Sequence, residues 1–96
     1  MQEKYQEQAE LLKALAHPVR LQIARGLMTY GCRNVGCMAT HTGQSQPCIS
    51  QQLTRLRAAG IVTAERSGNE VYYSLADPRV EGILKILFPP KREEGA

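Results

Sequence analysis

The segment from Ser45 to Gly60 carries the signals of both ends of a helix. Ser45 is a favourable N-cap, Pro47 is well tolerated at the first helical position, and Gly60 stands where a helix would end in a left-handed cap. The inward positions recur at spacings of four and three, which is a helical period: Ile49, Leu53 and Leu56. The segment therefore predicts an amphipathic helix that buries one stripe and leaves a polar face outside.

The residues on either side of this helix restrict the fold further. Before it, a short helix near 35–40 leads into "HTGQS", where Gly43 can adopt the positive φ that other residues resist. After it, 61–75 alternates as two strands around "SGN", which predicts a β-hairpin with Arg66 at its tip. These elements together predict a winged helix-turn-helix, in which the second helix enters a major groove and the wing touches the DNA backbone or minor groove.

Three further helices complete the expected fold. Apolar spacing and proline positions predict helices over 5–16, 18–28 and 77–88, and 91–96 is expected to be a frayed tail. The 96 residues suit one domain over 1–96, mainly α with five helices and a small two-stranded wing. The first and last helices carry apolar stripes that one subunit of this size cannot fully bury, so both are expected to form a dimer interface. These stripes are Tyr5, Ala9, Leu12, Leu15 and Ala16 in the first helix and Val80, Ile83, Leu84 and Leu87 in the last.

Positive charge is concentrated in the middle of the chain. The net charge is +3, but the stretch from Val19 to Arg66 holds six arginines and one acid, Glu65. This distribution of charge is expected of a protein that contacts DNA phosphates, although scattered arginines more often form a solvated basic face. No apolar run approaches the length of a membrane span and the N-terminus has no signal-peptide pattern, so we expect a cytoplasmic protein without a membrane partner.

Three motifs resemble one known family in order and in spacing. They are "LLKALAHPVRLQIARGL" from Leu11, "SQPCISQQLTRLRAAGIV" from Ser45 and "RSGNEVYYSL" from Arg66, and together they resemble the arsenic-resistance repressor (ArsR/SmtB) family of bacterial winged-helix repressors. The resemblance implies a homodimer that binds a double-stranded DNA operator and represses transcription. It also implies release from the operator when an inducer, often a metal ion or a thiol-reactive species, binds or reacts.

The resemblance assigns DNA contacts to the wing tip at 66–69 and, in the recognition region, to Ser45, Gln46, Ser50, Gln51 and Arg55. The outer face of the helix carries no acid, and its arginine and glutamine side chains suit a guanine edge, an adenine edge or a phosphate. The alternatives are a plain solvated helix face and a simple turn role for Asn69. The predicted DNA contacts are Ser45, Gln46, Ser50, Gln51, Gln52, Thr54, Arg55, Arg66, Ser67, Gly68 and Asn69.

Cys32 and Cys37 lie in a glycine-containing stretch ahead of the recognition helix, and we expect them to sense the inducer. The glycines would let the two sulfurs reach disulfide distance or share a soft metal ion, and Arg33 between them would favour the reactive thiolate. Cys48 is a possible third member, because a helix start also favours a thiolate. The expected chemistry is reaction with an oxidant or persulfide, giving a reversible disulfide or polysulfide, or binding of a soft metal ion. The alternative is that the cysteines are small buried side chains.

Two metal sites that the resemblance implies have no match in this sequence. The family's thiolate site has a Cys-x-Cys spacing, whereas Cys32 and Cys37 are separated by four residues and fall off the family's ligand positions. The family's zinc site uses Asp and His side chains on the last helix, and 77–88 contains no histidine. His17 and His41 are expected to be structural or surface residues.

Other classes of function have less support from the residues. We expect no enzyme, because the chain has no Cys-x-x-Cys, no Gly-rich phosphate loop and one aspartate. A repressor without cysteine sensing and a winged helix used only for protein contacts remain the alternatives to a thiol-responsive repressor. The clustered arginines and the acid-free helix face argue against the protein-contact alternative.

Overall fold

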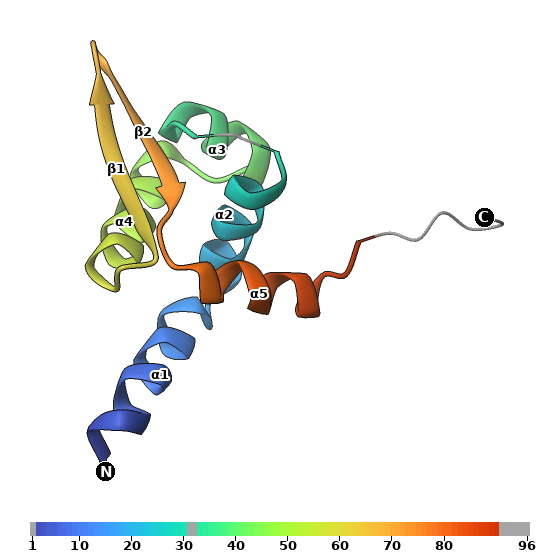
Figure 1. Cartoon of the computed structure of the whole chain (residues 1–96). Helices are drawn as coiled ribbons and strands as arrows, with labels where there is room; N and C mark the ends of the chain where they lie inside the picture. The colour runs from blue at the N-terminus through green and yellow to red at the C-terminus, as the bar shows by residue number, and fades with distance from the viewer. Residues whose placement is uncertain (1, 31–32, 91–96) are drawn as a thin grey trace, which may run out of the picture.

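The computed structural model describes residues 2–30 and 33–90. In chain order the elements are α1 Gln2–Leu15, α2 Pro18–Thr29, α3 Val35–Thr42, α4 Gln46–Ala58, β1 Val62–Ser67, β2 Glu70–Leu75 and α5 Pro78–Leu87. The described residues thus form five helices and one antiparallel hairpin, and the predicted winged helix-turn-helix is confirmed (Figure 1). The tail expected at 91–96 lies outside the described residues. Over these same ranges, every helix is too short or too polar to span a lipid bilayer.

Local signals in the sequence set where the helices begin and end. The Ser45 hydroxyl oxygen accepts a hydrogen bond from the backbone N–H three residues later at 3.2 Å, so the predicted cap of α4 is confirmed. Asn34 caps α3 in the same way, by accepting from the N–H of Cys37 at 2.7 Å. Gly43 and Gly60 have φ angles of 75° and 76°, the left-handed conformation expected of both. These caps and turns define α4 as a separate, well-bounded helix.

The core lies where α2, α3 and α4 meet the base of the hairpin and α5. Its centre is the inward stripe of α4, in which Ile49, Leu53 and Leu56 are at most 1% exposed, as their spacing predicts. Ile23 of α2 and Leu84 of α5 reach the same cluster from neighbouring helices. Burying one such side chain contributes roughly 1.5–3 kcal/mol. This stripe therefore holds α4 firmly on the domain and leaves its outer face for other contacts.

The stripe predicted for the first helix is buried only at the C-terminal end of α1. Leu15 is 3% exposed and Leu11, which the stripe did not include, is 7% exposed. Tyr5 and Leu12 are instead 71% and 55% exposed. Figure 1 shows the reason, because α1 leads away from the body and meets it only near its C-terminal end. Most of the α1 stripe is thus left uncovered by its own chain, as expected of a stripe that one subunit of this size cannot fully bury.

The last helix is divided in a similar way. Val80 and Leu84 of α5 are fully buried, whereas Ile86 and Leu87 are 81% and 53% exposed. The exposed pair lies in the last turn, beyond the part of α5 that contacts the core. The first and last helices therefore both leave large apolar side chains on the surface.

Asp77 is the N-cap of α5 and anchors the start of this helix. Its carboxylate accepts from the backbone N–H of Arg79 at 2.9 Å and from the Arg79 guanidinium at 2.7 Å. These hydrogen bonds to Arg79, from the side chain and then from the backbone, hold the pKa of Asp77 below its ordinary value. The carboxylate therefore stays ionised at the helix start, where the helix dipole favours a negative charge.

Candidate nucleic-acid interface

A short turn, 43–45, joins α3 to α4 and is fixed by local hydrogen bonds. The N–H of Gly43 donates to the carbonyl of Ala39 at 2.9 Å. The Thr42 hydroxyl accepts from the N–H of Gln44 at 3.3 Å. α4 begins one residue before Pro47, slightly earlier than predicted. The turn sets α4 at a fixed angle to α3, which is the arrangement of a helix-turn-helix.

The outer face of α4 is polar, exposed and free of acidic side chains. An α-helix turns by about 100° per residue, so Gln51 and Thr54 point away from the buried stripe. The Thr54 hydroxyl donates to the carbonyl of Ser50 at 3.0 Å and keeps its oxygen available as an acceptor. The predicted contacts that are exposed on α4 and at its cap are Ser45, Gln46, Ser50, Gln51, Thr54 and Arg55. All six are therefore accessible to a binding partner.

Gln52 is placed differently from the other predicted contacts on α4. It is half-buried, and its side-chain oxygen accepts from the Nε of Arg20 at 2.9 Å. Arg20 also donates to the carbonyl of Ala14 at 2.9 Å. Arg20 therefore ties α4 to the junction of α1 and α2, and it turns Gln52 toward α2. No local spacing predicts this contact, because the two residues are 32 positions apart in the chain.

Basic side chains lie along both flanks of α4. On one flank, Arg55 lines a hollow of about 430 Å³ together with Lys13 and Arg20 from the first two helices; Glu10 is the acid in this lining. On the other flank, Arg57 lines a hollow of about 280 Å³ that is shared with Tyr73 of β2. Arg57 is exposed, yet it is missing from the predicted contact set. Its position three residues after Thr54, on the same side of a helix, could have indicated it from the sequence.

The wing is the β1–β2 hairpin, which projects beyond the helices in Figure 1. Its last strand pair is Ser67 with Glu70, and Gly68 in the turn has a φ of 64°. Arg66 pairs with Val71, so it lies one pair before the turn rather than at the tip itself. The predicted wing contacts are all exposed: Arg66, Ser67, Gly68 and Asn69.

The cysteines of the described residues are in two different states. Cys37 is half-buried on α3 and is disulfide-bonded. Cys48 carries a free thiol, is half-buried, and lies with its sulfur 3.7 Å from the side-chain oxygen of Gln44. Cys32, the other predicted sensing residue, lies outside the described residues. Within 2–30 and 33–90, no three side chains of the His, Cys, Asp or Glu type are grouped so as to hold a metal ion.

Both histidines have structural contacts, as expected. His17 is the N-cap of α2, and its Nδ1 accepts from the N–H of Val19 at 3.1 Å. The ring of His41 on α3 lies against Tyr30 at the end of α2, with a centroid separation of 4.5 Å. The two pairs help to fix how α2 begins and how it meets α3.

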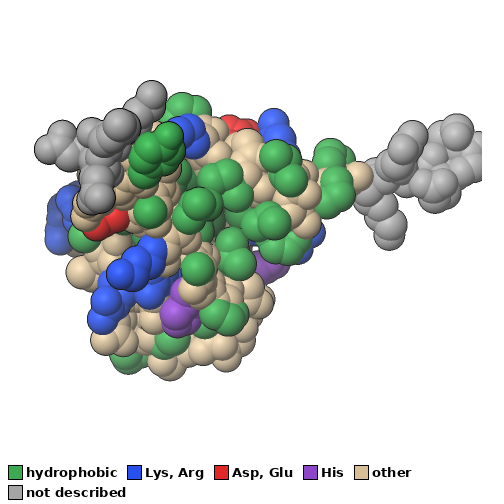
Figure 2. Space-filling model, turned by 90° about the horizontal axis from the view of Figure 1, so that it is seen from below, with side chains coloured by type: hydrophobic (Ala, Val, Ile, Leu, Met, Phe, Trp, Pro, Cys, Tyr) green, Lys and Arg blue, Asp and Glu red, His purple; other side chains and the backbone are tan. Residues whose placement is uncertain are grey.

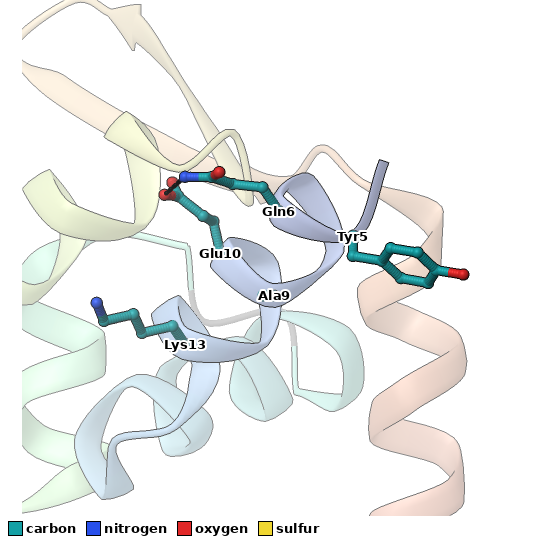
Figure 3. A pocket seen from close by; sticks show the side chains of 5 residues that line it. All are labelled: Tyr5, Gln6, Ala9, Glu10 and Lys13. Atoms are coloured by element: carbon teal, nitrogen blue, oxygen red, sulfur yellow. Dashed lines mark hydrogen bonds between the residues drawn. The ribbon is translucent and has the colours of Figure 1, made fainter. Parts of the chain in front are cut away.

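An open hollow of about 460 Å³ runs along α1 (Figure 3). Its lining comes from this one helix: Tyr5, Gln6, Ala9, Glu10 and Lys13. Gln6 donates to Glu10 at 3.4 Å, and Figure 3 shows Tyr5 pointing away from this pair. A hollow formed by one exposed helix is open to solvent and does not have the shape of an enclosed ligand site.

Comparison with known proteins identifies the family. A family model described as "Bacterial regulatory protein, arsR family" matches residues 17–64. The transcriptional repressor PagR of Bacillus anthracis is 39% identical over 84 residues, which cover 88% of this chain and 84% of PagR. The crystal structure of PagR is similar with a TM-score of 0.81 and 37% identity, over 91% of this chain and 99% of that chain.

Two further solved structures agree with this similarity. The reduced form of HlyU from Vibrio cholerae is 31% identical with a TM-score of 0.79, over 91% of this chain and 90% of that chain. Mb0332 from Mycobacterium bovis, described as a homodimeric winged helix-turn-helix DNA-binding domain, is 34% identical with a TM-score of 0.79, over 88% of this chain and 78% of that chain. This chain therefore belongs to the bacterial arsR family and is a DNA-binding transcriptional repressor, not an enzyme.

Proposed function

We propose that this repressor places α4 in the major groove of its operator and lays the wing on the neighbouring backbone. The observation that carries this proposal is the exposed outer face of α4, which has no acid and is bordered by Arg55 and Arg57. Amide side chains such as Gln51 can read adenine edges, and guanidinium groups can bind phosphates or guanine edges. The predicted contacts on the cap, α4 and the wing are the residues we assign to this interface, with Gln52 acting through its bond to Arg20.

Two single substitutions separate base reading from phosphate binding. Gln51→Ala should lower the affinity for operator DNA by about 1–3 kcal/mol, with little change in binding to unrelated DNA. Arg57→Ala should weaken binding to both DNAs alike and reduce the slope of affinity against salt by about 1. Fluorescence anisotropy titrations at several salt concentrations, with DNA from upstream of the encoding gene, measure both effects. If Gln51→Ala loses the same affinity for operator DNA and for unrelated DNA, Gln51 does not recognise a base.

We propose that the repressor acts as a homodimer, joined through the apolar surface that α1 and α5 leave exposed. Figure 2 shows hydrophobic side chains gathered across the middle of one face. Among the residues whose exposure is described, the large apolar ones on the surface are Tyr5 and Leu12 of α1, Ile86 and Leu87 of α5, and Tyr30 at the end of α2. Large apolar side chains that gather on an exposed face are typical of a contact site between proteins. The similar domain of Mb0332, which is described as homodimeric, supports this proposal.

We further propose that the inducer is an oxidant that joins Cys32 and Cys37 in a disulfide and weakens operator binding. Cys37 is disulfide-bonded while Cys48 keeps its thiol, and Cys32 is the third cysteine of the chain. Cys37 is on α3, the helix that the turn 43–45 joins to the recognition helix. A change in the bonding of Cys37 therefore occurs next to the DNA-reading element.

The chemistry balances with a peroxide as the oxidant. One cysteine thiolate attacks a peroxide oxygen, the O–O bond breaks, and a sulfenic acid forms as hydroxide leaves and is protonated to water. The second thiolate then attacks the sulfenic sulfur, so that the S–S bond forms and another water leaves. Two thiols and one hydrogen peroxide thus give one disulfide and two waters. A reducing thiol reverses the step by exchange.

The test compares operator binding by the reduced and the peroxide-treated protein. We expect binding to weaken by about 10-fold or more on oxidation. Cys37→Ser should abolish this response and keep the affinity of the reduced protein, whereas Cys48→Ser should keep the response. Intact mass identifies the product, since a disulfide has lost two hydrogens while a polysulfide or a soft-metal adduct has gained mass. If peroxide weakens operator binding by Cys37→Ser as much as by the wild type, this cysteine pair does not sense the oxidant.

A further inference from the structure

Arg33, in the connection between α2 and α3, is bound to the wing by three hydrogen bonds. Its carbonyl accepts from the backbone N–H of Tyr73 at 2.7 Å. Its Nε donates to the carbonyl of Tyr73 at 3.2 Å, and its Nη2 donates to the hydroxyl of Ser74 at 2.5 Å. Both backbone polar groups of Tyr73 are therefore bonded to one residue 40 positions earlier in the chain. We call these contacts of Arg33 with Tyr73 and Ser74 the Arg33 clamp.

The Arg33 clamp holds the wing at the end nearest the domain body. Tyr73 and Ser74 pair with Ala64 and Thr63 of β1, far from the turn at the tip. A small displacement at this end of a projecting hairpin becomes a larger displacement at its tip. The clamp also covers part of the β2 edge, whose polar groups would otherwise face water.

The same tyrosine reaches the recognition helix. The side chain of Tyr73 is half-buried against the core, and Tyr73 lines the hollow that contains Thr54 and Arg57 of α4. Arg33 is thus joined through Tyr73 to both parts of the DNA interface, the wing and one flank of α4. Arg33 itself is exposed and is not among the predicted DNA contacts.

The position of Arg33 also depends on the segment that ends at Cys37. Asn34, the next residue, fixes the first turn of α3 through its bond to the N–H of Cys37. Four residues separate Cys32 from Cys37, and Arg33 is the first of them. A disulfide between these cysteines closes a very small ring and removes much of the conformational freedom of the residues inside it. The ring would therefore restrict the backbone of Arg33 when oxidised and release it when reduced.

We propose that Arg33 is the positioning residue that transmits the thiol state of the sensing pair to the wing, a proposal that rests on the thiol switch above. In the oxidised protein the clamp holds the wing in one orientation that lowers operator affinity. In the reduced protein Arg33 is less restricted, and the hairpin can settle on the DNA backbone. Coupling of this kind requires an element with two arrangements that the sensing event biases, and the hairpin is that element.

Substitutions in the clamp test this proposal on operator binding. Wild-type protein should bind about 10-fold or more tightly when reduced than when oxidised. In Arg33→Ala this ratio should fall to within about 2-fold, although mass spectrometry shows that the disulfide still forms. Ser74→Ala removes one acceptor without changing the charge, and it should lower the ratio in the same direction. Arg66→Ala, the matched control on the wing, should weaken both states and leave the ratio unchanged.

Hydrogen exchange of the Tyr73 amide tests the clamp without DNA. We expect this amide, which donates to Arg33, to exchange about 10-fold more slowly in the oxidised protein than in the reduced protein. The Ala76 amide, which donates to Ile61 at 2.8 Å at the hairpin base, is the internal reference and should not change. The proposal is overturned if the Tyr73 amide exchanges at the same rate in the oxidised and reduced proteins. It is also overturned if Arg33→Ala keeps the wild-type ratio of reduced to oxidised operator affinity.

The two measurements also separate this inference from the function on which it rests. If Tyr73 exchange follows the thiol state while wild-type affinity does not, the clamp transmits the change and the proposed thiol control of the operator is wrong. If affinity follows the thiol state while Tyr73 exchange does not, the thiol control stands and the Arg33 route is wrong. If neither changes, both proposals fail.

Discussion

Replacing Leu12 and Ile86 together by glutamate should convert the repressor to a monomer and weaken operator binding on the order of 100-fold. Both side chains are large, apolar and mostly exposed, at 55% and 81%. In the proposed dimer they are buried against the partner, where an unpaired carboxylate is costly. Two linked recognition helices bind two half-sites far more tightly than one helix binds one, because the second contact becomes intramolecular. Sedimentation equilibrium and an operator titration measure the two effects on one protein preparation.

The control for added charge is Gln6→Glu. Gln6 is on α1 as well, but Figure 3 shows it on a different side of the helix from Tyr5. This variant should remain dimeric and bind the operator with nearly wild-type affinity. If the double variant stays dimeric, the dimer interface lies on another surface. Helical content, measured by circular dichroism, shows whether each subunit remains folded.

Leu53→Ala should lower the free energy of unfolding by about 2–5 kcal/mol. Leu53 is 1% exposed at the centre of the stripe that attaches α4 to the core, so its truncation leaves a cavity beneath the recognition helix. Small domains have a total stability of about 5–15 kcal/mol, and the loss is therefore a large fraction of it. Urea denaturation followed by circular dichroism measures the change. Operator affinity should fall as well, because the recognition helix loses its support.

Thr54→Ala is the matched control on the adjacent residue. Thr54 is exposed, and its hydroxyl bonds to a carbonyl of its own helix. Its truncation should change stability by no more than about 0.5 kcal/mol. If Leu53→Ala and Thr54→Ala lower the free energy of unfolding equally, the inner stripe of α4 is not what attaches this helix to the core.

The elements that could be predicted from the sequence are those set by neighbouring residues. The ends of α4 follow from Ser45 and Gly60, and its buried stripe follows from a helical period, so all were predictable. The stripe of α1 was predicted from the same period but is mostly exposed, because burial depends on where the body of the domain stops. Periodicity identifies an apolar face, but it does not say whether the same chain or another copy covers it.

Contacts between distant residues could not be predicted in this way. Gln52 fits the pattern of the polar helix face, yet Arg20 on α2 engages it. The sequence relates Arg33 only to the neighbouring thiols, whereas its side-chain hydrogen bonds are made to β2. Both arginines meet partners that no local spacing indicates. The fold was therefore predictable from local signals, and the residues that position the interface were not.

The free thiol of Cys48 has a practical consequence. While Cys37 is disulfide-bonded, Cys48 is the one free cysteine among the described residues, and it is in the first turn of the recognition helix. A maleimide fluorophore applied to the oxidised protein would therefore attach at the DNA-reading surface without any engineered cysteine. In the proposed complex, where the first turn of α4 lies against the operator, the emission of this fluorophore would report binding and release of DNA.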